Sequence, residues 1–263
     1  MRKILQKVPS FGNFFLTNVL GIIYCEVKMI YITGDTHGFN DIDKLVLNKT
    51  LASLTENDYL LITGDFGGIW DGGTHDEDIL DYYAKKPYTT LFIDGNHENF
   101  DLLNSYPVVQ WNGGKIHRIN SKVIHLMRGQ IFNIENMSIF AFGGALSIDK
   151  VYRTLGISWW PEEEPSEEEC TEAMENLEKN GFIVDYIVSH AAPESIVRNE
   201  INNAHKLLCL DCEAEKFLDK VLEKAVYRRW YCGHYHFDMD ITDCRLSVLY
   251  QNVLELKSGR KVK

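Results

Sequence analysis

Residues 60–65 read Leu-Leu-Ile-Thr-Gly-Asp, a short apolar run that ends in a glycine and an acidic residue. The same arrangement occurs at residues 30–35, Ile-Tyr-Ile-Thr-Gly-Asp, and at residues 91–96, Leu-Phe-Ile-Asp-Gly-Asn. Continuous apolar runs of this length, bounded by glycine, predict buried strands. The sequence therefore predicts three strands that each end in a polar side chain.

The segments between these runs have helical spacing. Residues 39–49 and 76–86 place apolar side chains three or four positions apart, and Pro87 ends the second predicted helix. This β-α-β-α-β order predicts parallel strands joined by right-handed crossovers.

A group of closely spaced strands follows, and we expect antiparallel hairpins there. Ser166 and Glu169 form a capping-box pattern at the start of a predicted helix, so we interpret the acidic run 162–169 as a helix start and not a metal site. The fold predicted is mixed α/β, two mixed β-sheets packed together with helices outside. The expected elements are strands 116–118, 122–127, 130–134, 137–142, 185–189 and 227–232, helices 166–179 and 213–224, and a final meander over 237–242, 245–250 and 252–256.

The length of 263 residues favours one large domain, which we assign to residues 29–263. Residues 1–28 differ in character, because three basic residues precede an apolar stretch from Phe14 to Cys25. This stretch resembles a signal peptide, but Asn18 interrupts it and no small-residue cleavage site follows. We interpret residues 1–28 as an N-terminal extension or a start codon assigned too early, with Met29 as the alternative start.

The composition and charge limit the partners of the chain. Hydrophobic residues make up 45% and charged residues 25%, with a net charge of −11. Such acidity argues against strong binding of duplex nucleic acid. The six cysteines are too sparse for a disulfide framework, and the Cys209-x-x-Cys212 pair is best explained by ordinary packing. We expect a cytoplasmic protein without membrane association, and its oligomeric state stays open.

Five apolar runs end in side chains that can bind metal ions. Ligands in open α/β sheets bind beyond the carboxyl ends of the strands, so these side chains are expected to meet. Each motif alone is common turn chemistry, but five together are not explained by chance. The D-x-H and H-x-H spacings are expected to place both side chains on one side of an extended segment. The runs end at Asp35 with His37, at Asp65, at Asn96 with His97 and Glu98, at His190, and at His234 with His236.

These motifs resemble, in the same order over residues 29–236, the signature of the calcineurin-like metallophosphoesterase family. The resemblance implies a four-layer α/β/β/α sandwich and two metal ions. It implies that His97 acts beside the substrate phosphate as general acid or charge stabiliser, and that Glu98 orients His97. The implied ligands are Asp35, His37 and His236 for the first ion, Asn96, His190 and His234 for the second, and Asp65 as the bridge between them.

The chemistry of such a centre agrees with these residue types. Imidazole and oxygen ligands suit manganese, iron or zinc better than magnesium or calcium. Two divalent ions about 4 Å apart lower the pKa of a bridging water, and the resulting hydroxide can attack phosphorus. The expected activity is hydrolysis of a phosphomonoester or phosphodiester, with a phosphorylated small molecule or a nucleotide as substrate.

One part of the family pattern is missing. Protein phosphatases that resemble this family carry Asp-Arg-Gly after the Gly-Asp motif, whereas residues 66–73 contain no arginine. Protein-phosphatase activity is therefore in doubt. The insertion 143–161 offers Arg153 for phosphate and Trp159 for stacking on a base, although aromatic packing within the loop explains Trp159 equally well. His75, His117, His125 and His205 fall outside the strand-end pattern, and we expect structural or surface roles for them.

Two alternatives remain beside the main interpretation. The first is a nuclease or cyclic-nucleotide phosphodiesterase, which the acidic charge disfavours for duplex substrates. The second is a non-catalytic scaffold of the same fold that binds partners. We rank the scaffold lower because His97 and the full ligand set are present.

Overall fold

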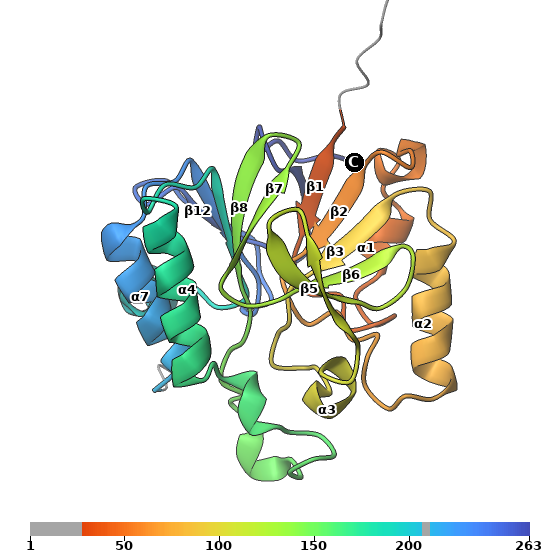
Figure 1. The fold of residues 1–263 in the computed structure, drawn as a ribbon, viewed down its shortest axis with the longest axis horizontal. Coiled ribbons are helices and arrows are strands. Elements are labelled where there is room, and N and C mark those ends of the chain that lie inside the picture. Colours follow the sequence, from red (N-terminus) through yellow and green to blue (C-terminus); the bar gives the residue numbers. More distant parts are fainter. Residues whose placement is uncertain (1–27, 207–210) are drawn as a thin grey trace, which may run out of the picture.

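The computed structural model describes residues 28–206 and 211–263. Two β-sheets lie face to face, with helices α1 and α2 outside one sheet and helices α4 and α7 outside the other (Figure 1). The predicted mixed α/β fold with two mixed sheets is confirmed. The predicted extension, residues 1–28, lies outside the described residues except for Lys28.

The first sheet contains the three strands predicted from the opening motif. β1, β2, β3 and β6 are parallel, and β13 pairs with β1 in the antiparallel direction. β4, β5 and β6 form an antiparallel edge. The strand order is β13 (Val253–Glu255), β1 (Ile30–Thr33), β2 (Tyr59–Ile62), β3 (Thr89–Phe92), β6 (Val123–Leu126), β5 (Gly114–Arg118) and β4 (Val108–Trp111).

The second sheet is also mixed. Its central strands β8, β9, β10 and β12 are parallel, and β7 and β11 are antiparallel edges. The strand order is β11 (Met239–Ile241), β12 (Leu246–Val248), β10 (Arg229–Cys232), β9 (Tyr186–Ser189), β8 (Met137–Phe142) and β7 (Gln130–Ile134).

The helices largely follow the sequence pattern. The predicted capping box is present. The Ser166 hydroxyl accepts a hydrogen bond from the Glu169 amide, and the Glu169 carboxylate accepts one from the Ser166 amide. The helical segments are α1 (Asp43–Val46), η1 (Leu51–Ser53), α2 (Thr74–Ala84), α3 (Phe100–Leu103), η2 (Lys150–Tyr152), η3 (Pro161–Glu163), α4 (Glu167–Lys179), α5 (Glu194–Ile196), η4 (Val197–Ile201), α6 (Asn202–His205) and α7 (Glu213–Lys224).

The core has three layers. One lies between the two sheets, and each of the other two lies between one sheet and the helices that cover it. Ile32 and Leu61 of the first sheet pack against Ile139 and Val188 of the second in the central layer. Side chains that alternate with these, such as Tyr31, face the outer helices instead. This alternation explains why the strands are apolar on both faces.

Two sequence predictions are wrong in detail. The helix expected over residues 39–49 shrinks to α1, because the preceding segment turns back and binds the second strand end: the His37 and Gly38 amides donate to the carbonyls of Asp65 and Phe66 at 2.8 and 2.9 Å. The expected final meander does not form, because β13 leaves the second sheet and pairs with the open edge of β1.

No helix in the described part of the chain is long and apolar enough to cross a membrane.

Candidate metal centre and substrate pocket

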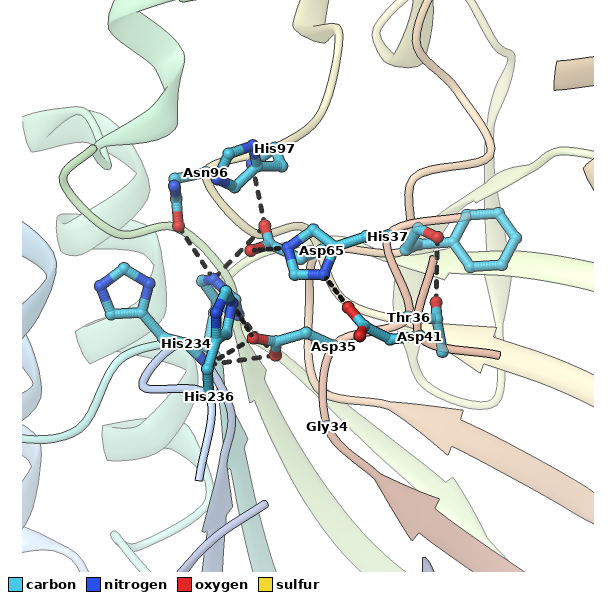
Figure 2. Close-up of polar contacts among 12 residues, drawn as sticks. Gly34, Asp35, Thr36, His37, Asp41, Asp65, Asn96, His97, His234 and His236 are labelled. Carbon is cyan, nitrogen blue, oxygen red and sulfur yellow. Dashed lines mark hydrogen bonds and ion pairs between the residues drawn. The ribbon is translucent and has the colours of Figure 1, made fainter. Parts of the chain in front are cut away.

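The five strand ends meet at one place, as the sequence predicts. Residues after β1, β2, β3, β9 and β10 converge beyond the carboxyl ends of these strands. Figure 2 shows the carboxylates of Asp35 and Asp65 in the middle, with His37, His97, His234 and His236 around them. Segments 199 residues apart in the chain are in direct contact here, since the His234 amide donates to Asp35 at 3.1 Å.

Four side chains on one side of the centre form a group that can hold a metal ion. The donor atoms of Asp35, His37, Asp65 and His236 all lie within 4.8 Å of one another. His37 Nε2 lies 3.2 Å from Asp65 Oδ2, and His236 Nε2 lies 3.3 Å from Asp35 Oδ2. These are the three side chains expected around the first ion together with the expected bridge.

The remaining expected ligands lie on the other side of Asp65. His190 Nε2 is 3.1 Å from Asn96 Oδ1 and 3.5 Å from Asp65 Oδ1. The rings of His190 and His234 are 5.0 Å apart and meet edge to face. The seven predicted ligands, of which Asp65 is one, are therefore brought together at one place.

Outer hydrogen bonds orient two of the imidazoles. Asp41 Oδ2 lies 2.7 Å from His37 Nδ1, and Asp41 is held in turn by the Tyr250 hydroxyl at 2.7 Å. His190 Nδ1 lies 2.7 Å from the Thr63 carbonyl. In both residues Nε2 is left facing the centre, the usual arrangement of metal-binding histidines. Asp41 is not among the residues predicted from the sequence, although its position four residues after His37 is a usable signal.

The backbone at the centre is strained. His37, Asp65, His234 and His236 all have positive φ, between 42° and 70°. Non-glycine residues rarely adopt this conformation, and it concentrates at functional sites. The expectation of extended D-x-H and H-x-H segments is therefore wrong, because the last residue of each motif, His37 or His236, has a left-handed backbone conformation.

The glycines before the ligands make room for neighbouring carboxylates. A Cβ on Gly95 would lie 2.0 Å from Asp65 Oδ1, and a Cβ on Gly233 would lie 2.2 Å from Asp35 Oδ1. Both distances are too short for any side chain. The glycines therefore allow the strand ends to approach one another closely.

The charges at the centre call for a cation. Asp35 and Asp65 are fully buried carboxylates a few ångströms from each other. Burial alone would lower the pKa of His37 and His190, but the hydrogen bond and charge of Asp65 outweigh it and raise each pKa to about 9. The negative charge of the two buried carboxylates is the charge that divalent cations would balance. The donor set and its charge fit metal binding.

His97 lies beside this group and faces the pocket. Its amide donates to Asp65 Oδ1 at 2.8 Å, and Arg153 Nη2 lies 3.0 Å from its Nε2. Glu98 is fully buried, and its Oε1 accepts from the Phe66 amide at 2.8 Å. The other oxygen of Glu98 has no hydrogen-bond partner in the described structure. Its expected action on His97 stays a prediction.

A pocket of about 390 Å³ opens next to the centre. Arg153, from the insertion, lies at the pocket, as the sequence analysis expected for a phosphate-binding residue. Trp159 is not among the lining residues and packs under Lys150, whose Nζ lies 4.0 Å from the ring. The lining residues are Asp65, Asn96, His97, Leu146, Ile148, Asp149, Arg153, Val197, Cys212, Glu215, His234, Tyr235 and His236.

A hydrogen-bond chain links the insertion to the centre. Asn96 Nδ2 donates to Ser147 Oγ at 3.0 Å, and Ser147 donates to Glu163. The amide nitrogen is thereby fixed away from His190, and Asn96 Oδ1 faces the centre. Glu163 is 1% exposed. Glu163 belongs to the acidic run 162–169, which is interpreted from the sequence as a helix start. In the structure, only the residues from Ser166 onward form the start of α4.

Arg128 holds the base of the insertion. Its guanidinium forms a buried ion pair with Asp94 at 2.6 Å and donates to the Glu162 carbonyl at 2.7 Å. Asp94 stands two residues before Asn96, so this pair connects the insertion with the third strand end. No pattern in the sequence pointed to Arg128.

The histidines expected to be structural are placed accordingly. His125 lies 3.0 Å from Asp94 and 3.1 Å from His117, and both rings are buried. His75 and His205 are exposed. Cys212 is a free, buried thiol, while Cys209 of the C-x-x-C pair lies outside the described residues.

The chain matches a known protein family. The family described as calcineurin-like phosphoesterase matches residues 28–238. No curated protein matches the chain. Among solved structures, the chain is similar to the crystal structure of a phosphopantetheinyl hydrolase from Mycobacterium tuberculosis. That similarity has 15% identity and a TM-score of 0.42, and it covers 85% of this chain and 88% of that chain.

Two facing mixed sheets carry these possible metal donors at their strand ends, which is the arrangement expected for a metal-dependent phosphoesterase. The matched residues make up most of the sequence, and the chain belongs to the calcineurin-like phosphoesterase family. The chain is therefore a metal-dependent phosphoesterase.

Proposed function

We propose that the chain hydrolyses phosphomonoesters or phosphodiesters at a centre of two divalent metal ions. Asp35, His37 and His236 hold the first ion, and Asn96, His190 and His234 hold the second. Asp65 bridges the two. The observation that carries this proposal is the position of Asp65, whose Oδ2 faces His37 at 3.2 Å and whose Oδ1 faces His190 at 3.5 Å.

The ions supply the activated water and the charge that a phosphoryl transfer needs. Manganese, iron or zinc suits these imidazole and oxygen ligands. The chain itself orients the ligands, because Asp41 and the Thr63 carbonyl fix the rings of His37 and His190.

His97 and Arg153 act on the substrate in this proposal. Both line the pocket, and the His97 backbone is fixed by its hydrogen bond to Asp65. His97 donates a proton to the leaving oxygen or stabilises its charge. Arg153 stabilises the phosphate and takes the place of the arginine that residues 66–73 lack.

The size of the pocket favours a small phosphoester over a nucleic acid. A volume of about 390 Å³ matches small-molecule sites. The sparse, unpaired cysteines of the described chain agree with action in the cytoplasm.

An activity panel tests the proposal. Metal-free protein is reconstituted with manganese and assayed on aryl phosphomonoesters, aryl phosphodiesters and nucleotides. We expect Asp65→Asn to lose metal and activity, and His97→Ala to keep its metal while kcat falls by about 10²–10⁴-fold. His75→Ala, an exposed histidine, is the matched control and should keep full activity.

Two results would count against it. Failure of protein shown to hold two metal ions to turn over any substrate would overturn the enzymatic proposal. Full activity of His97→Ala would remove only the role given to His97.

A further inference from the structure

The residues that line the substrate pocket are of two chemical kinds. Asp65, His97 and Arg153 are polar and belong to the proposed metal centre or contact it. Leu146, Ile148 and Val197 are apolar. One buried acidic side chain, Glu215, also lines the pocket and has no part in the metal centre.

Glu215 is held in place by a single hydrogen bond. It belongs to the first turn of α7 and is 8% exposed. The Tyr235 hydroxyl accepts a hydrogen bond from the Ala192 amide at 3.0 Å and therefore donates its one proton to Glu215 Oε1 at 3.1 Å. Tyr235 stands between His234 and His236, so Glu215 is tied to the same loop as two proposed ligands.

Within residues 28–206 and 211–263, no Lys, Arg or His side chain forms an ion pair with the Glu215 carboxyl. The charge of Arg198, which pairs with Glu194 at 2.6 Å, acts on Glu215, and the negative charges of Glu194 and Glu164 oppose it. A buried carboxylate with one donor has unused acceptor capacity, and burial of such a group is unfavourable until further donors are supplied. Because Glu215 lines the pocket, a bound ligand can supply them.

We propose that Glu215 is the specificity residue for the organic group of the substrate, and that the preferred substrates are phosphate esters of alcohols that carry an ammonium group. This inference rests on the proposed function, which places the phosphate at the metal centre. The apolar walls contact the carbon chain, and the ammonium group donates to Glu215. A charge-assisted hydrogen bond of this kind is among the stronger contacts that a pocket offers.

The same carboxyl disfavours other substrate classes. A second phosphate or a carboxylate on the organic group would face Glu215 with like charge. Nucleoside diphosphates and phosphorylated acids should therefore be poor substrates. A purely apolar alcohol should bind its chain but leave Glu215 without a donor.

A matched substrate series tests the proposal. The manganese-loaded enzyme is assayed on ω-aminoalkyl phosphates with two to six carbons, on n-alkyl phosphates of equal length, and on ω-carboxyalkyl phosphates. We expect at least one aminoalkyl phosphate to exceed its alkyl counterpart by about tenfold or more in kcat/KM. The carboxyalkyl phosphates should be the poorest.

Variants attribute the preference to Glu215. Glu215→Gln should reduce the ratio of kcat/KM for aminoalkyl phosphates to kcat/KM for alkyl phosphates to below about threefold. Glu213→Gln, an exposed glutamate two residues earlier on α7, is the matched control and should keep the full preference. Circular dichroism and a thermal melt show whether Glu215→Gln is folded.

The outcomes separate this inference from the proposed function. Turnover of the alkyl and amino series at equal rates, or an ammonium preference that survives Glu215→Gln, would overturn the role of Glu215 alone. If Glu215→Gln does not fold, competitive inhibition of the wild type by n-alkylamines decides, since no inhibition would also overturn it. Absence of turnover on every phosphate ester would count against the proposed function.

Discussion

Asp41 shows how a residue outside the ligand set acts on the metal centre. Its carboxylate lies 2.7 Å from His37 Nδ1 and accepts a hydrogen bond from the Tyr250 hydroxyl at 2.7 Å. His37 is thereby held with Nε2 toward Asp65. Carboxylates in this position orient the imidazole and increase its basicity.

The Asp41→Asn variant should bind metal more weakly. An amide at this position keeps the size of the side chain but loses the negative charge that faces His37. We expect the affinity for manganese to fall by about 10–100-fold in a metal titration. Asp43→Asn, an exposed acidic residue on α1, is the control. Equal affinity of the wild type and Asp41→Asn would show that Asp41 does not support His37.

The proposed ligands could be named from the sequence because they follow apolar runs, and the structure brings them together. Asp35, Asp65 and His190 all stand one to three residues after a strand. Asp41, Ser147 and Glu163 follow no strand end, and only folding brings them to the centre. Their roles depend on side-chain contacts between distant segments, which local patterns do not encode.

At the scale of elements, the insertion between β8 and α4 is held by buried charge. Arg128 pairs with Asp94 and binds the carbonyls of Glu162 and Glu163. The Asp94 pKa lies well below its usual range, because the charge of Arg128 and contacts with Arg128 and His125 outweigh its burial. These contacts therefore anchor the C-terminal end of the insertion beside the third strand end.

Removal of Arg128 should be costly. In the Arg128→Met variant, Asp94 would remain as a buried carboxylate without its main partner. We expect the free energy of unfolding to fall by about 3–5 kcal/mol in urea denaturation. The control Lys115→Met removes a surface partner of Glu172 and should cost no more than about 1 kcal/mol. Similar small losses in both variants would contradict the structural role of Arg128.

Glu215 on α7 gives the stability a pH dependence. Burial is the main cause that raises the pKa of Glu215 to about 7, above the ordinary glutamate value of 4.5. The folded state therefore favours the neutral carboxyl, and the wild type loses stability as the pH rises from about 4.5 to about 7. Glu215→Gln lacks this loss, so the variant should gain up to about 3 kcal/mol relative to wild type across that range.

The measurement is urea denaturation of metal-free protein at pH 5 and pH 7.5. Glu213→Gln should track the wild type at both pH values. A constant difference between the wild type and Glu215→Gln would mean that the Glu215 pKa is the same in the folded and unfolded states.

The positions of helices and strands along the chain were predicted better than the pairing of the strands in the sheets. Glu213–Lys224 matches the expected helix residue for residue, since its apolar spacing and flanks are clear. The final strands were placed near the right residues, but β13 joins the first sheet and not the second. Strand periodicity defines which residues are extended and buried, whereas the neighbour in the sheet depends on long-range packing.

At the scale of the molecule, the metal centre lies where the two sheets meet. The proposed ligands after β1, β2 and β3 come from the first sheet, and those after β9 and β10 come from the second. We propose that residues 29–263 form a single domain for this reason. The central apolar layer, which contains side chains of both sheets, supports the same view.

A single domain should unfold in one transition. Trp230 lies in the core of the second sheet, and Trp160 packs against Trp70 beside the first. In wild type, tryptophan fluorescence and circular dichroism should give the same urea midpoint. In Trp230→Phe, fluorescence reports mainly the first sheet. Within this variant, fluorescence and circular dichroism should again give one common midpoint, whatever the effect of the substitution on stability. Two separate transitions would indicate independent domains.

The number of metal ions per chain tests the central claim most directly. Protein saturated with manganese, freed of excess metal and analysed for elemental content should contain two ions per chain. Asp65→Asn should contain fewer, because this variant loses the proposed bridge. One ion or none per chain in saturated wild-type protein would contradict the dinuclear centre.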